Sequence, residues 1–171
     1  MEEKRNFDLL TLGQVLLRLS PPNNDRLVRG DTFVKQVGGA ELNVAVGVAL
    51  LGLRTGVISK LPSHDMGSFM KGKIRSYGVS DDFFMYDDSP SARVGIYYYE
   101  NGAYPRKPKV IYDRANSSFY SLKIDEIPEK AYTASRCFHT SGITLALSPK
   151  VRETTIEMIK RFKAAGTLVS F

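Results

Sequence analysis

A diglycine at Gly38–Gly39 separates two apolar segments of different periodicity, and this junction constrains the fold more than any other feature of the sequence. Residues 32–37 alternate between apolar and polar types, which predicts a half-exposed strand. The residues after the diglycine predict an apolar helix that reaches Leu51 and ends at Gly52. A strand, a glycine turn and a helix in succession indicate an α/β protein whose helix N-terminus is open to a ligand.

The predicted helix carries small and polar residues along one side. Gly39, Asn43 and Gly47 are four residues apart, so they lie one above another and expose backbone and an amide to a ligand. In the alternative interpretation, glycine is needed at this turn only for its backbone dihedrals. We expect the apolar residues of the same segment to pack into the core: Val44, Val46, Val48, Leu50 and Leu51.

The composition predicts one soluble globular domain, since 43% of the 171 residues are apolar and 25% are charged. No apolar run is long enough to cross a bilayer, and the charged residues 1–5 do not resemble a signal peptide, so we expect a cytoplasmic protein without membrane contact. The only cysteine, Cys137, lies in an apolar segment and is expected to be a buried, inert thiol. The net charge of +6 is scattered, so it favours an anionic small molecule and not nucleic acid.

Strands and helices are predicted to alternate, which is typical of a parallel sheet with helices on both faces. Buried strands are predicted at 8–13, 55–59, 83–86, 136–141 and 167–171. One helix is expected to start at an Asp65 N-cap and to end at Gly78. Another is expected to start at a Ser148 N-cap with Pro149 in its first position, and to end at Gly166.

Residues 92–112 have a different pattern, in which tyrosine and β-branched residues alternate with polar ones. Two alternating runs, 92–99 and 109–112, flank a proline-containing loop, so this segment predicts an antiparallel hairpin. The sequence stops after the apolar strand 167–171 with no helix to cover that strand, so we expect the 171 residues to be the first part of a longer sheet protein.

Ligands of open α/β sheets bind beyond the carboxyl ends of the strands. Three segments are predicted at that edge: Gly13 with Gln14, Gly38 with Gly39, and residues 141–144. The hairpin adds Tyr97 and Tyr112, whose rings and hydroxyl groups can form a wall of the site, and Arg114. A guanidinium group can hold a carboxylate by two parallel hydrogen bonds.

Each of these candidates also has a purely structural interpretation. Arg114 can form a surface pair with its neighbour Asp113, the tyrosines can simply pack across the strands, and residues 141–144 can be a plain strand exit. His64 and His139 lack partners at metal-ligand spacing, so we expect both to be structural and no metal site to be present.

Several motifs together resemble one enzyme family. The run Gly-Gly-Ala-Glu-x-Asn-Val-Ala from Gly38, followed by Leu51-Gly52-Leu53 and by Gly67, resembles the N-terminal signature of the ribokinase-like (PfkB) sugar kinases. Within that family, the 2-keto-3-deoxygluconate kinases are similar at residues 19–22, 95–97, 112–115, 117–118 and 140–149. The resemblance runs from Asp8 to the last residue, with the motifs in the same order.

The resemblance implies a ribokinase-like, Rossmann-type parallel sheet with helices on both faces, of which residues 1–171 form the N-terminal sugar-binding part. It also implies a small β-sheet lid, formed by about 22–37 and 91–116, that excludes water and pairs two copies into a homodimer. The implied reaction is ATP-dependent phosphoryl transfer to a primary hydroxyl of a sugar acid, most closely 2-keto-3-deoxygluconate. The alternatives are a fructokinase or another PfkB sugar kinase, and a non-catalytic fragment that binds sugar or dimerises.

The resemblance assigns substrate binding to seven positions, namely Gly38, Gly39, Asn43, Tyr97, Tyr112, Arg114 and Ile143. The arginine and the tyrosines are expected at the carboxylate end of the sugar acid. Gln14 stands where the family often has glutamate. The family's catalytic aspartate, in a Gly-Ala-Gly-Asp turn, and its nucleotide pocket have no counterpart in these 171 residues. We therefore expect ATP and Mg²⁺ to act only in the full-length enzyme, and this chain alone to be inactive and to bind neither.

Overall fold

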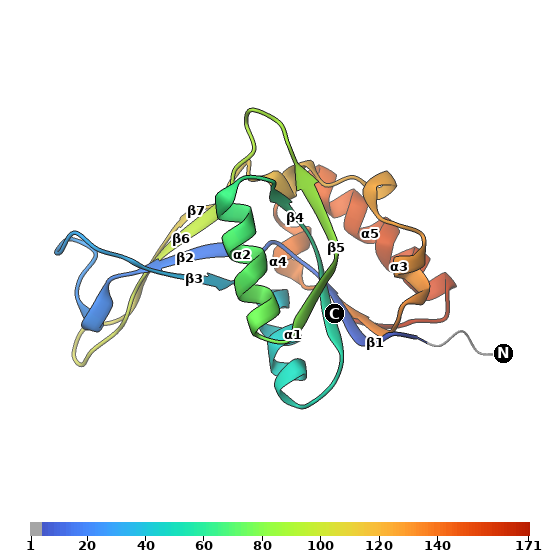
Figure 1. Cartoon of the computed structure of the whole chain (residues 1–171), viewed down its shortest axis with the longest axis horizontal. Helices are drawn as coiled ribbons and strands as arrows, with labels where there is room; N and C mark the ends of the chain where they lie inside the picture. The colour runs from blue at the N-terminus through green and yellow to red at the C-terminus, as the bar shows by residue number, and fades with distance from the viewer. Residues whose placement is uncertain (1–4) are drawn as a thin grey trace.

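The main sheet of the protein is parallel throughout (Figure 1). The computed structural model describes residues 5–171; residues 1–4, part of the segment judged not to be a signal peptide, lie outside it. All neighbouring strands pair in parallel, in the order β5-β4-β1-β8-β9. The strands are β1 (Phe7–Leu12), β4 (Thr55–Pro62), β5 (Val79–Asp87), β8 (Ser135–His139) and β9 (Leu168–Ser170). The five predicted strands are therefore confirmed, and β4 and β5 are longer than predicted.

Helices cover both faces of this sheet, with α1 and α2 on one face and α3 and α5 on the other (Figure 1). The helices are α1 (Ala40–Leu50), α2 (Asp65–Ser76), α3 (Lys130–Thr133), α4 (Gly142–Leu145) and α5 (Pro149–Ala164). Val57 of β4 packs in the core cluster beneath α1 and α2, whereas its neighbour Ile58 packs in the opposite cluster with Phe138 and Phe162. The rings of Phe138 and Phe162 stack with their centroids 4.0 Å apart. The predicted fold class is confirmed.

A second, four-stranded sheet extends away from the main body (Figure 1). Its order is β3-β2-β6-β7, and its strands are β2 (Leu16–Ser20), β3 (Val34–Gly38), β6 (Gly95–Glu100) and β7 (Lys109–Asp113). The predicted antiparallel hairpin is confirmed as β6 and β7. Strand β2 was not predicted, and it lies outside the range 22–37 expected for the lid. Leu16 and Leu17 point to opposite faces of the sheet, and both are buried. The sequence of β2 therefore does not show in full the alternation of apolar and polar residues that marks a half-exposed strand.

Two expectations for the helices were wrong. In α1, Leu50 and the C-cap residue Leu51 are each 80% exposed and Val44 is also exposed, whereas Leu42 and Ala45 form the buried stripe. Of the residues expected in the core, Val46 does pack against it. The N-cap of α2 is His64 and not Asp65, because the His64 Nδ1 accepts the backbone N–H of Met66 at 3.2 Å. Apolar residues lie on all sides of α1, so the sequence does not show which side is buried. For α2, the side chains of both His64 and Asp65 can accept a hydrogen bond at the helix start.

The start of α5 was predicted correctly. Ser148 caps the helix, because its hydroxyl accepts the backbone N–H of Val151 at 3.2 Å, and Pro149 is the first residue. Cys137 is half-buried, and desolvation raises the pKa of its thiol. A protonated thiol is a poor nucleophile, so this agrees with an inert residue. Between residues 5 and 171, no helix is both long enough and apolar enough to cross a bilayer.

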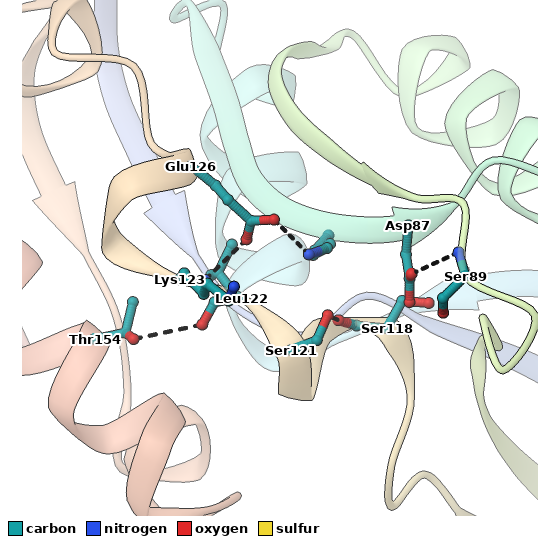
Figure 2. A network of polar contacts seen from close by, with 9 residues as sticks. Asp87, Ser89, Ser118, Ser121, Leu122, Lys123, Glu126 and Thr154 are labelled. Atoms are coloured by element: carbon teal, nitrogen blue, oxygen red, sulfur yellow. Dashed lines mark hydrogen bonds and ion pairs between the residues drawn. The ribbon is translucent and has the colours of Figure 1, made fainter.

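Polar contacts fasten the segment that returns from the second sheet to the core (Figure 2). The Lys60 Nζ of β4 lies 2.6 Å from the Glu126 Oε1, and the Thr154 hydroxyl of α5 donates to the carbonyl of Leu122 at 3.4 Å. Both contacts tie short 3-10 turns to the main sheet and its helices. The segment 118–126, which follows the second sheet in the chain, is therefore fixed to the core. The 3-10 turns of the chain are η1 (Pro22–Asn24), η2 (Ser118–Ser121) and η3 (Ile124–Glu126).

Candidate functional site

A cavity of about 340 Å³ lies between the second sheet and the N-terminal ends of α1 and α4. Six of the seven predicted site residues line it: Gly39, Asn43, Tyr97, Tyr112, Arg114 and Ile143. The other residues of its wall are Gln14, Leu16, Arg18, Ala40, Glu41, Tyr99 and Val110. The structure thus brings together residues that lie up to 129 positions apart in the sequence, from Gln14 to Ile143.

Both glycines of the diglycine are required by close approaches. Gly39 has a φ of +153°, and a Cβ at this position would lie 2.7 Å from the carbonyl oxygen of Gln14. A Cβ on Gly38 would lie 2.5 Å from the hydroxyl oxygen of Tyr97. Gly38, the seventh predicted residue, does not line the cavity. Its lack of a side chain leaves room for the Tyr97 hydroxyl, which does belong to a lining residue. Both interpretations of the diglycine apply, because it serves the backbone turn and it shapes the site.

Arg114 is held by Gln14, a buried side chain that is 3% exposed. The Arg114 Nε donates to the Gln14 Oε1 at 2.7 Å, and the Gln14 Nε2 donates to the carbonyl of Arg114 at 3.1 Å and to the Ser117 hydroxyl at 2.6 Å. Asp113 pairs instead with Arg93, at 2.8 Å. The surface pair of Arg114 with Asp113 is therefore not present. The guanidinium group faces the cavity with its Nε anchored.

The two predicted tyrosines both pack against each other and line the cavity. Tyr97 and Tyr112 are opposite one another in the β6–β7 register, and their ring centroids are 5.9 Å apart. Desolvation raises the pKa of the Tyr97 hydroxyl, although the positive charge of Arg18 opposes this shift. The hydroxyl is therefore protonated at neutral pH and can donate a hydrogen bond to a ligand.

Glu41 forms the core side of the cavity, and its side chain is 1% exposed. The Glu41 Oε1 accepts hydrogen bonds from the Ser141 hydroxyl at 2.6 Å and from the Thr144 hydroxyl at 2.8 Å. These bonds fix the turn into α4 against α1 and leave Ile143, which is 49% exposed, in the cavity wall. Residues 141–144 thus contribute Ile143 to the cavity wall and are more than a strand exit.

Sequence reasoning did not place Arg18, Glu41 or Tyr99 in the binding site. A signal for Arg18 exists in the segment 16–20, where the arginine alternates with leucines, but the strand itself was missed. Glu41 lies within the diglycine motif itself, which is the signal that could have identified it. Tyr99 continues the alternation of Tyr97 and marks the same face of β6.

Residues 5–171 contain no group of three or more histidine, cysteine, aspartate or glutamate side chains that could hold a metal ion. The acidic cavity residue Glu41 is a single carboxylate already engaged by two hydroxyl donors. This part of the chain therefore does not fit a Mg²⁺ site. Its cavity fits a polar organic molecule that carries hydroxyl groups and negative charge.

The chain is similar in sequence to curated proteins that are named as kinases. A 2-dehydro-3-deoxygalactonokinase from Haloferax volcanii is 38% identical over 96% of this chain and 51% of its own length. A 5-dehydro-2-deoxygluconokinase from Shouchella clausii is 30% identical over 99% of this chain and 52% of its own length. The chain spans about half the length of the curated relatives it matches.

Solved structures show the same relationship. The crystal structure of 2-dehydro-3-deoxygluconokinase from Thermotoga maritima has a TM-score of 0.89 and 36% identity, covering 95% of this chain and 49% of that chain. A fructokinase from Xylella fastidiosa has a TM-score of 0.82 at 22% identity, covering 96% of this chain and 49% of that chain, which shows the common fold alone. Residues 6–170 match the description "pfkB family carbohydrate kinase". Because this match extends over nearly the whole sequence, the chain belongs to the pfkB family of carbohydrate kinases.

Proposed function

We propose that this chain is the sugar-acid-binding part of a kinase that transfers a phosphoryl group from ATP to a primary hydroxyl of a 2-keto-3-deoxy sugar acid, with 2-keto-3-deoxygluconate as the first candidate. One observation carries the proposal: Arg114 faces the cavity with its guanidinium group held by Gln14. A fixed guanidinium group is suited to a carboxylate. The names of the three relatives that are at least 30% identical support the class, because each describes a kinase of a deoxy-keto-hexonic acid.

The proposed orientation of the substrate follows from the two sides of the cavity. The second sheet supplies Arg114 and the tyrosines, which suit the carboxylate end. The core supplies the side chain of Asn43, which suits a sugar hydroxyl group. The second sheet acts in this proposal as a lid that excludes water from the phosphoryl group.

Phosphoryl transfer also needs a base at the acceptor hydroxyl and a bound metal–nucleotide. We infer that the 171 residues alone do not turn over substrate, because they contain no Gly-Ala-Gly-Asp turn. ATP, with Mg²⁺, is proposed as the phosphoryl donor of the complete enzyme, which we expect to act in the cytoplasm. ATP-dependent phosphorylation of 2-keto-3-deoxygluconate by the purified 171-residue protein would contradict the inference of inactivity.

The proposed substrate class is tested by isothermal titration calorimetry on this chain. We expect 2-keto-3-deoxygluconate or its C4 epimer, 2-keto-3-deoxygalactonate, to bind more tightly than fructose. Charge recognition further predicts that affinity for the acid falls as salt is added, whereas affinity for fructose does not. Equal or tighter binding of fructose would favour the fructokinase alternative and contradict the proposal.

We also propose that the lid pairs two copies of the chain. On the face of the second sheet opposite the cavity, Phe33 and Ile111 are each about half exposed, and Phe33 contacts Tyr98 with ring centroids 6.0 Å apart. Apolar groups on a small sheet with free edges favour association. Sedimentation velocity is expected to show a dimer that Ile111→Lys converts to monomer. A wild-type protein that stays monomeric at high micromolar concentration would refute this arrangement.

A further inference from the structure

Arg18 lines the same cavity as Arg114 and has no role in the function proposed so far. It lies on β2, in the middle of the second sheet between β3 and β6 (Figure 1). Its guanidinium carbon lies 4.3 Å from the ring centroid of Tyr99, and its Nε donates to the Ser20 hydroxyl at 2.9 Å. These two contacts fix the guanidinium plane. Among residues 5–171, no group accepts a hydrogen bond from its two terminal nitrogens.

The strand register places Arg18 on the cavity side of the sheet. Arg18 is opposite Tyr97 across β2 and β6, and Tyr97 is opposite Tyr112 across β6 and β7. Residues directly opposite one another share a face of the sheet. Gly95 lies two residues before Tyr97 on β6, so it is on the same face and one residue pair nearer the core. Arg114 is next to Gly95 on this face, because a Cβ on Gly95 would lie 3.4 Å from the Cβ of Arg114. The backbones of the two arginines therefore occupy successive levels of one face, and the Arg18 side chain extends along that face to Ser20 and Tyr99.

The charges of the cavity are divided between its two sides. The charged residues in its wall are Arg18, Arg114 and Glu41, which gives +2 and −1, a net charge of +1. Glu41 belongs to the core side, and its Oε1 is already bonded by two hydroxyl donors. Both positive charges belong to the second sheet. Two positive charges on one face repel each other, and a neutral sugar does not reduce this repulsion. A bound monocarboxylate does reduce it, because its negative charge neutralises the excess positive charge.

We propose that Arg18 is a specificity-determining residue that binds the carboxylate end of a sugar acid together with Arg114, so that the cavity selects acids over neutral sugars. This proposal rests on the proposed function, since it concerns the same substrate. Stacking on Tyr99 and the bond to Ser20 orient the guanidinium, and its terminal N–H groups donate to a carboxylate oxygen. The competing explanation is that Arg18 only packs against Tyr99.

Calorimetric titration of wild type, Arg18→Gln, Arg18→Lys and Arg29→Gln with 2-keto-3-deoxygluconate and with fructose separates these explanations. Arg29 is a matched control, because it is an exposed arginine of the second-sheet loop that does not line the cavity. We expect Arg18→Gln to weaken acid binding about 10- to 100-fold and to change fructose binding less than about 2-fold. Arg18→Lys is expected to recover part of the acid affinity, and Arg29→Gln to behave as wild type.

The outcomes distinguish failure of this proposal from failure of the proposed function. Wild type that does not bind the acid contradicts both. Wild type that binds the acid, with Arg18→Gln equal to it, overturns only the role of Arg18. Equal losses on acid and fructose assign Arg18 a packing role and also overturn the proposal. If thermal denaturation shows that Arg18→Gln is unfolded, the same comparison is made with Arg18→Lys, whose loss must again be selective for the acid.

Discussion

Replacing Gln14 by leucine tests whether this residue positions Arg114. The side chain is 3% exposed and makes three hydrogen bonds, one of them with the charged Arg114. Hydrogen bonds between neutral groups contribute about 0.5–1.5 kcal/mol each, and one with a charged group about 1.5–3 kcal/mol, which gives roughly 2.5–6 kcal/mol for the three. Leucine has a similar volume, and its burial offsets about 1–2 kcal/mol. We expect the free energy of unfolding to fall by about 2–4 kcal/mol.

Binding provides the second measurement on Gln14→Leu. Without its anchor the Arg114 guanidinium gains rotamer freedom, so we expect affinity for the sugar acid to fall about 10-fold, with little change for fructose. Urea denaturation gives the stability and calorimetry gives the affinity. Gln36→Leu is the matched control, since Gln36 is exposed and its substitution should change stability by less than about 0.5 kcal/mol. Reduced stability with unchanged acid affinity would show that Gln14 does not position Arg114, and unchanged stability would refute the energetic argument itself.

Three further predictions address the carboxylate contact, the core and acid stability. In the full-length enzyme, Arg114→Ala should weaken acid binding by about 2–4 kcal/mol, near 30- to 1000-fold, and spare fructose, while Arg114→Lys recovers part of the loss; equal losses on both sugars would make Arg114 structural. Phe162→Ala should lower the free energy of unfolding in urea by about 3–5 kcal/mol, because the ring is fully buried and stacked on Phe138; a loss below about 1 kcal/mol would contradict this packing. Desolvation raises the pKa of Asp87, but hydrogen bonds with Ser89 and Ser118 outweigh it, so the folded pKa lies below 3.8. Its stabilisation is therefore present above pH 3.8 and is lost as the pH falls through the folded pKa, so the stability difference between wild type and Asp87→Asn should shrink in acid; a constant difference would exclude the linkage.

The core of the fold could be predicted from the sequence because its signals are local. The cap and the apolar stripe of α5 depend on residues three and four positions apart, and the strands of the main sheet are short apolar runs. Strand β2 had only the short alternation Leu17-Arg18-Leu19 as a signal, because the core and the cavity cover its two faces and both Leu16 and Leu17 are buried. A strand covered on both sides cannot show the full alternation that marks a half-exposed one.

Six of the seven residues predicted for the candidate site line one cavity, but their contacts were not predicted. Asp113 is the sequence neighbour of Arg114, yet successive residues of a strand point to opposite faces, and Asp113 pairs with Arg93 instead. The actual partner of Arg114 is Gln14, 100 residues away. Only the register of the second sheet against the core brings these two together. Sequence spacing carries no information about that register.

The division of charge between the two sides of the cavity links substrate choice to closure. Glu41 and Asn43 belong to α1 of the core, whereas Arg18 and Arg114 belong to the second sheet and the segment that leaves it. On the proposed function, the hydroxyl end of the substrate rests on the core and its carboxylate reaches the lid. A sugar acid then bridges the two parts and favours the closed arrangement, because a ligand shifts an equilibrium toward the state that it contacts better. A neutral sugar contacts the core equally well but gives the two arginines no anion, so it discriminates less between open and closed arrangements. On the proposed function, the same sheet would both exclude water from the site and recognise the charge of the substrate.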